Sequence, residues 1–483
     1  MKSQFKRKYE GLRWSLIGGD TPGVERTAII ELQRLLQYYL PYVLPVQWAA
    51  GVNAMEMEHI AVLGTAASNR LIAGLLASGQ LAPPVGEEGY SIALLDSPWR
   101  PGSRLLAVAG TDASGVLYGV QEACARLFLG GTLLDGRAAM RQHLEKVPAF
   151  ALQERPAVRD RGIWSWGYTI YCYRRFINHM VKLKMNMLTI WNDHVPLNAR
   201  EIIQYAHERG IRVIFGFHWG WGFQGTLDIS RPEDRNQIRQ VVLETFRNQY
   251  ADLNLDGIYF QTLTEHTNRS LAGRTTAAWA CKLVNEVSRQ LLALYPSLPI
   301  QFGLHATSIR EDYRDLRDLD ERVVITWEDC GSFPFSYSPG DTQAFEQTLE
   351  FAKNISALRP GCDYAMVPKG LMCMRWDQEF ENHGPFILGE RSRQFIRERL
   401  NERQNEWDVV NDQWYRLYPL AARFYRELLK VNPCMTVTGL VDDALFEEKI
   451  QPSVALFAQT LWNPHQSDAE LLGQAMRPYC LRS

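Results

Sequence analysis

Aromatic, acidic and histidine side chains gather at the ends of short apolar runs in the second part of this 483-residue chain. Seven of the 14 tryptophans fall at such ends. The flat faces of tryptophan suit the C–H faces of sugar rings, and carboxylates can transfer protons. The combination therefore predicts a carbohydrate site. The tryptophans are Trp164, Trp166, Trp191, Trp219, Trp221, Trp327 and Trp376.

Strand alternation narrows this set, because side chains two positions apart on a strand share a face. The rule puts five polar residues on the inner faces of five strands, so that they converge on one mouth. A buried carboxylate without a partner costs several kcal/mol, so such a cluster needs partners or a function. A hydrogen-bonded network that closes the barrel top is the structural alternative. The five residues are Asp193, His218, Glu265, His305 and Glu328.

Two carboxylates that face each other across a sugar are what glycosidic cleavage requires. Glu265, beside apolar Leu263, is the predicted general acid. Glu328 is the predicted partner, and Asp329 is the next candidate because a shift of one residue would exchange the two. Asp377 is a third candidate. The predicted substrate-binding residues are Arg161, Trp164, Trp166, Trp191, Asp193, His194, His218, Trp219, His305, Trp327, Trp376 and Asp377.

These residues need a scaffold of parallel strands, and from Arg161 onward eight apolar runs alternate with amphipathic helices. Such an alternation predicts an α/β fold, a TIM (β/α)8 barrel whose chemistry lies at the C-terminal strand ends. An open doubly wound sheet is the alternative, but no glycine-rich phosphate loop follows any run. The predicted strands are 162–166, 187–191, 213–218, 257–264, 300–305, 323–328, 364–371 and 454–461.

The first 150 residues have a different pattern, which predicts a small α+β domain. Helices are expected at 27–39 and 116–128, and strands at 61–64 and 105–110. The predicted domains are residues 1–150 and a catalytic barrel at 151–483. A helical insertion is expected around 386–430, and its charged stretch Arg391–Asp408 is expected to be a solvated helix.

Composition excludes several classes of protein. The chain has 52 Lys and Arg against 54 Asp and Glu, so no polyanion-binding excess is present and no nucleic-acid partner is expected. No apolar run approaches the roughly 20 residues of a membrane span, and the start lacks the apolar segment of a signal peptide. Eight scattered cysteines without C-x-x-C favour free thiols. We therefore expect a cytoplasmic protein without membrane partner, cofactor or metal; its oligomeric state is left open.

Several motifs resemble those of bacterial α-glucuronidases and β-N-acetylhexosaminidases. Residues 110–122 (GTDASGVLYGVQE) resemble the turn and helix of the small domain before their barrels. Arg161-Gly162 with residues 182–188 resembles the opening of the barrel, and residues 205–213 the entry to its third strand. Leu461–Pro464 is similar to the eighth strand end. The resemblance implies a glycoside hydrolase with an α+β domain before a (β/α)8 catalytic barrel.

One departure separates the two families. Hexosaminidases of this group carry an Asp before the catalytic Glu, whereas Thr264 precedes Glu265 here. A lone Glu is more similar to the α-glucuronidases, which the resemblance would make inverting enzymes. Arg161, Lys369 and Arg375 are candidates for binding a uronate group.

The sequence thus predicts an exo-acting glycoside hydrolase that removes a terminal sugar, such as a uronic acid or an amino sugar, from oligosaccharides. A metal-dependent sugar isomerase or epimerase would use the five converging residues as ligands, but no local ligand spacing supports it. A non-catalytic carbohydrate-binding protein would keep the tryptophans without needing the carboxylates.

Overall fold

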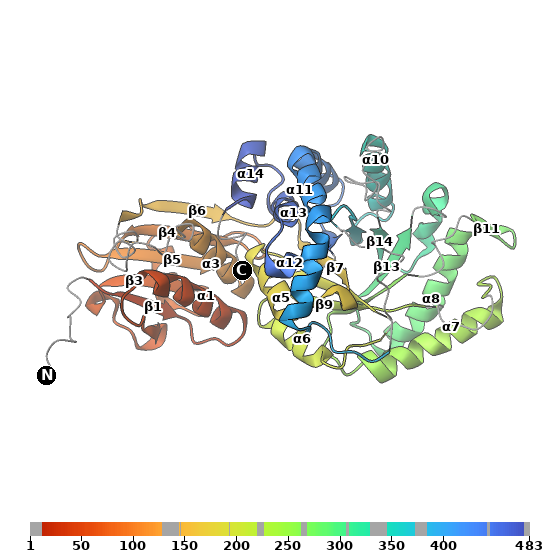
Figure 1. Ribbon diagram of the computed structural model, residues 1–483, viewed down its shortest axis with the longest axis horizontal. Coiled ribbons are helices and arrows are strands. Elements are labelled where there is room, and N and C mark those ends of the chain that lie inside the picture. Colours follow the sequence, from red (N-terminus) through yellow and green to blue (C-terminus); the bar gives the residue numbers. More distant parts are fainter. Residues whose placement is uncertain are drawn as a thin grey trace. The chain divides into compact units, whose positions relative to one another are not determined.

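The chain divides into two compact units, Met1–Pro156 and Ala157–Ser483 (Figure 1). This split falls a few residues after the domain boundary at residue 150 that the sequence suggests. The computed structural model describes residues 12–127, 144, 146–192, 194–219, 227–261, 268–305, 309–328, 345–371, 384–441 and 445–477.

The first unit contains a six-stranded sheet in the order β2-β1-β3-β5-β4-β6. Strands β2, β1, β3 and β5 run parallel, and β4 is antiparallel to both β5 and β6. The strands predicted at 61–64 and 105–110 are confirmed as β3 and β5. The bounds are β1 Trp14–Gly18, β2 Val46–Trp48, β3 His59–Gly64, β4 Tyr90–Asp96, β5 Arg104–Gly110 and β6 Phe150–Glu154.

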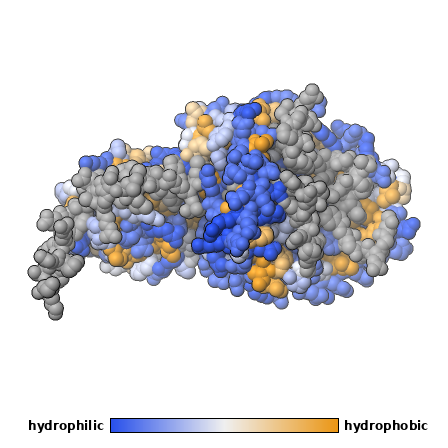
Figure 2. All heavy atoms as spheres, viewed as in Figure 1, coloured by the Kyte–Doolittle hydropathy of each residue, from blue (hydrophilic) through white to orange (hydrophobic). Residues whose placement is uncertain are grey.

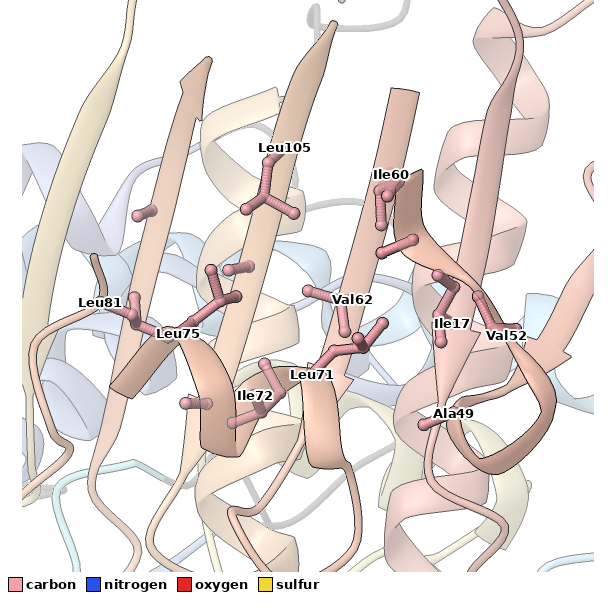
Figure 3. Close-up of a cluster of buried hydrophobic side chains, with 14 residues drawn as sticks. Ile17, Ala49, Val52, Ile60, Val62, Leu71, Ile72, Leu75, Leu81 and Leu105 are labelled. Atoms are coloured by element: carbon pink, nitrogen blue, oxygen red, sulfur yellow. The ribbon is translucent and has the colours of Figure 1, made fainter. Parts of the chain in front are cut away.

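Helices α1 (Val24–Tyr39), α2 (Arg70–Ala77) and α3 (Ala113–Leu127) accompany this sheet. Leu71, Ile72 and Leu75 of α2 pack into a cluster with apolar side chains of the strands (Figure 3). At the start of α3, the Asp112 carboxylate accepts the backbone N–H groups of Gly115 and Glu88 at 2.8 and 2.7 Å. The stretch Gly110–Gly115 (GTDASG) therefore fixes the start of α3 against the neighbouring loop.

The second unit is a closed barrel of eight parallel strands, which confirms the predicted α/β TIM-barrel fold. Each strand pairs with its neighbour in sequence order, and β16 closes the ring on β7. The bounds are β7 Asp160–Trp166, β8 Met187–Trp191, β9 Arg212–Gly216, β10 Gly257–Gln261, β13 Ile300–His305, β14 Val323–Glu328, β15 Tyr364–Val367 and β16 Met435–Leu440.

The strand predicted at 454–461 is wrong. This segment forms helix α13 (Pro452–Trp462), and the eighth strand is β16. Pro452 stands at the first helical turn, where its missing N–H costs nothing. Most of the run is buried, against α11 as well as the barrel, so its apolar residues show no one-sided period. The stretch Leu461–Pro464 accordingly ends a helix and not the eighth strand.

Helices surround the barrel strands. The longest is α11 (Arg393–Leu429), which lies between β15 and β16 in the chain and covers most of the predicted insertion. Hydrophilic residues follow its outer face (Figure 2), as expected for a solvated helix. The others are α5 Tyr173–Lys182, α6 Ala199–His207, α7 Pro232–Thr245, α8 Thr276–Leu294, α10 Phe345–Ser356, α12 Leu445–Glu448, α13 and α14 Asp468–Ala475. No helix in the described part of the chain is long and apolar enough to span a membrane.

A buried histidine joins two of these helices. His179 of α5 donates from Nδ1 to the carbonyl oxygen of Phe446 in α12, at 2.6 Å, and its ring meets the Phe446 ring edge-on at 5.6 Å. Burial, together with the positive charges of Lys182 and Arg175, lowers the pKa of His179 to about 4. The neutral ring is therefore the form that the folded protein holds.

This arrangement predicts acid sensitivity. An unfolded histidine has a pKa near 6.5, so the folded form binds protons less readily, and stability is lost as the pH falls from about 6.5 toward 4. Between pH 7.5 and 4.5 the loss from this one group should be about 2–3 kcal/mol. His179→Asn, whose amide can donate to the same carbonyl without titrating, should lose less free energy of unfolding over this interval. Equal losses in urea titrations of both proteins would contradict the assignment.

Candidate active site

The candidate active site is built around Glu328, the last residue of β14, inside the barrel. Its carboxylate is 2% exposed. Lys369 Nζ lies 2.9 Å from Oε2, and the Gln261 side-chain amide donates to the same oxygen at 3.4 Å. The Tyr259 hydroxyl donates to Oε1. Both carboxylate oxygens therefore receive donors from other strands or strand ends.

These partners favour the ionised form of Glu328. Each donates a hydrogen bond to the carboxylate, and Lys369, itself 5% exposed, adds a positive charge in direct contact. Burying an ion pair is costly unless further hydrogen bonds satisfy both groups, and Tyr259 and Gln261 supply such bonds to the carboxylate. A carboxylate held in this way is suited to attack or to accept a proton and poorly suited to donate one.

Strand alternation explains how these groups meet. Tyr259 and Gln261 are two positions apart on β10, so both face inward, and Lys369 follows β15 by two positions beyond Val367. Gly303 of β13 has no side chain, which leaves space for the Tyr259 hydroxyl and the Glu328 carboxylate. A Cβ at this position would lie 2.7 Å from Glu328 Oε1 and closer still to the Tyr259 hydroxyl. Only glycine fits beside this hydrogen bond without displacing it.

Three of the predicted tryptophans come together beside this site. Trp164 and Trp191 stack at 6.3 Å between ring centroids, and Trp166 meets Trp191 edge-on at 5.9 Å. Tyr259 contacts Trp164 and Trp191, each at 5.9 Å, so the cluster reaches Glu328 through one shared ring. Gly216 leaves space for the Trp191 ring, since a Cβ at position 216 would lie 3.2 Å from Cδ2 of the Trp191 indole and closer still to Cε3.

Trp219 and Trp327 lie elsewhere. The Trp219 ring stacks on Phe260, and Trp327 packs against Phe351 of α10 at 4.5 Å. Both residues are almost completely buried. Phe260 and Trp327 alternate with Tyr259 and Glu328 along their strands, so they occupy the outer faces, where helices cover the barrel. Sugar binding by these two tryptophans stays a prediction.

Arg161 lies at the start of β7, whereas Glu328 ends β14, so the parallel strands put the two at opposite ends of the barrel. Its guanidinium donates to the carbonyl oxygens of Val158 and Arg159 at 3.3 and 3.0 Å. It also lies over the Trp462 ring at 5.1 Å. The contact with Trp462 attaches α13 to the barrel, and the two carbonyl oxygens accept hydrogen bonds from the buried guanidinium.

The remaining predicted residues are only partly described. His194 and His218 follow β8 and β9 and are half-buried; the backbone N–H of His194 donates to the Asn192 side chain at 3.2 Å. The backbone of His305 ends β13 opposite Glu328, but its side chain lies outside the described part. Their roles stay predictions. Asp193, Glu265, Asp329, Trp376 and Asp377 lie outside the described residues.

Sequence reasoning missed Tyr259 as a partner of Glu328. The signal was present, because Tyr259 stands an even number of positions before Glu265, which the sequence puts on the inner face. Lys369 was a candidate for a uronate group, and its ammonium here pairs with Glu328. Within the described residues, no three His, Cys, Asp or Glu side chains are grouped as metal ligands.

Neither a family model nor a curated protein matches this sequence. Solved structures do match. A GH138 enzyme that targets pectin rhamnogalacturonan II has a TM-score of 0.53 and 13% identity over 95% of this chain and 52% of its own. A β-N-acetylhexosaminidase matches at a TM-score of 0.41 and 12% identity, over 82% of this chain and 89% of its own. GH5_18 from Streptomyces cattleya, in complex with GlcNAc, matches at 0.39 and 8%, over 65% and 82%.

The chain spans about half the length of the GH138 enzyme, and at this identity the match shows a shared fold. The enzyme that shares this fold is a glycoside hydrolase. The predicted resemblance to glycoside hydrolases that carry an α+β domain before a (β/α)8 barrel is therefore confirmed at the level of the fold.

The space at Gly303 gives a testable prediction. Gly303→Ala should displace Tyr259 from Glu328 and lower the melting temperature, because the added methyl group overlaps the hydroxyl. Tyr259→Phe in the same chain removes that hydroxyl and should restore part of the loss. Thermal unfolding of the single and double variants checks this. An additive effect of the two substitutions would show that the two positions do not share this space.

Proposed function

We propose that the protein is a glycoside hydrolase whose active site is the C-terminal end of the barrel around Glu328. The observation that carries the proposal is a buried carboxylate that pairs with Lys369 and accepts hydrogen bonds from Tyr259 and Gln261, beside a cluster of three tryptophans. Carboxylate and aromatic faces together are what cleavage of a glycosidic bond uses. The fold shared with the GH138 enzyme supports the same class.

The proposed roles of the two carboxylates rest on the contacts of Glu328 and on the sequence position of Glu265. Glu328 acts as the anion, either attacking the anomeric carbon or activating water. Glu265 donates the proton to the leaving oxygen. In the sequence, Glu265 is the first acidic residue after Gln261, the last residue of β10, and the Gln261 side chain contacts Glu328. This closeness in sequence supports Glu265 as the second carboxyl group.

The proposed action is exo, on a terminal sugar such as a uronic acid or an amino sugar. Trp164, Trp166 and Trp191 come from two adjacent strands and gather aromatic rings beside Glu328, the type of side chain on which a terminal sugar stacks. A metal-dependent isomerase is less well supported. The ammonium of Lys369 already contacts Oε2 of Glu328, and its charge would oppose binding of a divalent cation there.

A panel of aryl glycosides, with uronides and N-acetylhexosaminides included, tests the class of reaction. We expect release of the aryl group from one sugar series. On a defined oligosaccharide of that sugar, the first product should be a single residue from the non-reducing end. Internal fragments as first products would refute exo action while leaving hydrolysis intact, and turnover of no glycoside in a folded preparation would contradict the class.

Glu265→Gln should keep the fold and lower turnover of an unactivated substrate by several orders of magnitude. A substrate with a good leaving group needs little proton donation, so it should lose much less. Comparing kcat for both substrates in the wild type and the variant measures the difference. Equal losses would exclude Glu265 as the acid.

Glu328→Gln should give the opposite pattern. The loss should be large on both substrates, because the anion is needed whatever the leaving group. Glu286→Gln is a matched control, since it neutralises a carboxylate that pairs with Arg235 in the outer helices at 3.0 Å. That control should keep wild-type kcat. Wild-type turnover in Glu328→Gln would remove the basis of the proposed site.

A further inference from the structure

Lys369 is a buried positive charge beside Glu328, and the proposed reaction gives it no role as acid, base or nucleophile. It stands two positions beyond β15, and its Nζ lies 2.9 Å from Oε2 of Glu328, with both side chains almost fully buried. Such a position is unfavourable for a lysine unless a negative charge lies beside it. The lysine and the carboxylate therefore stabilise each other in the barrel interior.

We propose that Lys369 is a positioning residue that sets the lower pH limit of activity by holding Glu328 ionised and fixed in orientation. This proposal rests on the assignment of Glu328 as the reacting anion. It gives Lys369 a role through Glu328 and not through contact with the sugar. A uronate-binding role for the same lysine would make its removal depend on the substrate, which distinguishes the two roles.

The groups around the carboxylate define what can titrate with it. Within the described residues, Tyr259 on β10 and Lys369 after β15 are the titratable groups in contact with Glu328. On β13, between β10 and β14, Gly303 adjoins Glu328 Oε1, and Gln301 two positions earlier does not ionise. The Tyr259 hydroxyl donates its proton to Glu328 without adding a positive charge, whereas the ammonium of Lys369 adds one that opposes protonation of Glu328.

Removal of the positive charge of Lys369 should change the pH dependence of activity in a defined direction. A buried carboxylate that loses its cation is more easily protonated, so a reaction that needs the anion fails at a higher pH. In Lys369→Met, the acid limb of kcat/KM against pH should therefore move upward, by about 1–3 pH units. Lys369→Arg keeps the charge and should leave the limb near its wild-type position, although kcat falls because the longer group displaces the carboxylate.

The chain offers a matched control in Lys184. This lysine is also buried, and its Nζ lies 4.5 Å above the Trp462 ring, before β8 and so at the opposite end of the barrel. Lys184→Met should change the melting temperature without moving the acid limb. A limb that moves in this variant as in Lys369→Met would show a general effect of destabilisation and would overturn the proposal.

The measurements use the full chain and the aryl glycoside identified by the panel. A shifted limb in Lys369→Met, recovered in Lys369→Arg, supports the proposal. An unmoved limb in a folded Lys369→Met protein overturns it, even if Glu328→Gln is inactive and the function stands. Lys369→Gln is carried in parallel in case methionine prevents folding, and it should move the limb in the same direction. A loss confined to uronides, with the limb unmoved on neutral glycosides, would assign Lys369 to substrate binding and overturn the proposal.

Discussion

The barrel interior is organised around a buried ion pair, Glu328 with Lys369. Two charges withdrawn from water cost several kcal/mol each unless their surroundings replace the lost hydration. This need constrains the neighbouring strands: Tyr259 and Gln261 must face inward as donors, and Gly303 must lack a side chain. At the opposite end of the barrel, a second buried carboxylate, that of Asp160, is also paired with positive charges. Burial opposes ionisation of Asp160, but Arg212 and Arg159 outweigh it and hold the pKa of Asp160 below its usual range.

Between the two charged ends lies an apolar layer that contains Trp164, Met187, Trp191 and Tyr259. A barrel of eight strands has a fixed interior volume that side chains must fill without overlap. Large rings from β7 and β8 fit because β9 contributes Gly216 at the level of Trp191. The tryptophans are therefore part of the packing of the barrel as well as of the mouth. Tyr259 connects the apolar layer with the ion pair, since its ring packs on two indoles and its hydroxyl donates to Glu328.

Local periodicity predicted most of this fold. Strands β8, β13 and β14 begin and end at the residues expected from sequence, because each is a short apolar run buried by its neighbours. The same signal failed at residues 454–461, where a helix buried on most sides has the composition of a strand. In the site, alternation along the strand predicted that Glu328 faces inward. The ion pair with Lys369 was not predictable, because partner choice between distant strands depends on barrel closure and not on local sequence. Trp327 shows that position at a strand end does not define a face: the alternation that turns Glu328 inward turns its neighbour toward Phe351.

The surroundings of Glu328 also bear on where a proton could come from. Acid and base roles in one site separate when the environments of two groups differ in sign. The described contacts of Glu328 are with donors and a cation, which favour its negative charge and make it a poor source of the proton that a leaving oxygen would need. The donor must then be a carboxyl group outside this set of contacts yet close to the same mouth. Gln261, the last residue of β10, contacts Glu328, and the next acidic residue in the sequence is Glu265. Under the proposed function, the ion pair would therefore do more than stabilise the barrel, because by favouring the negative charge of Glu328 it would leave proton donation to a second carboxyl group.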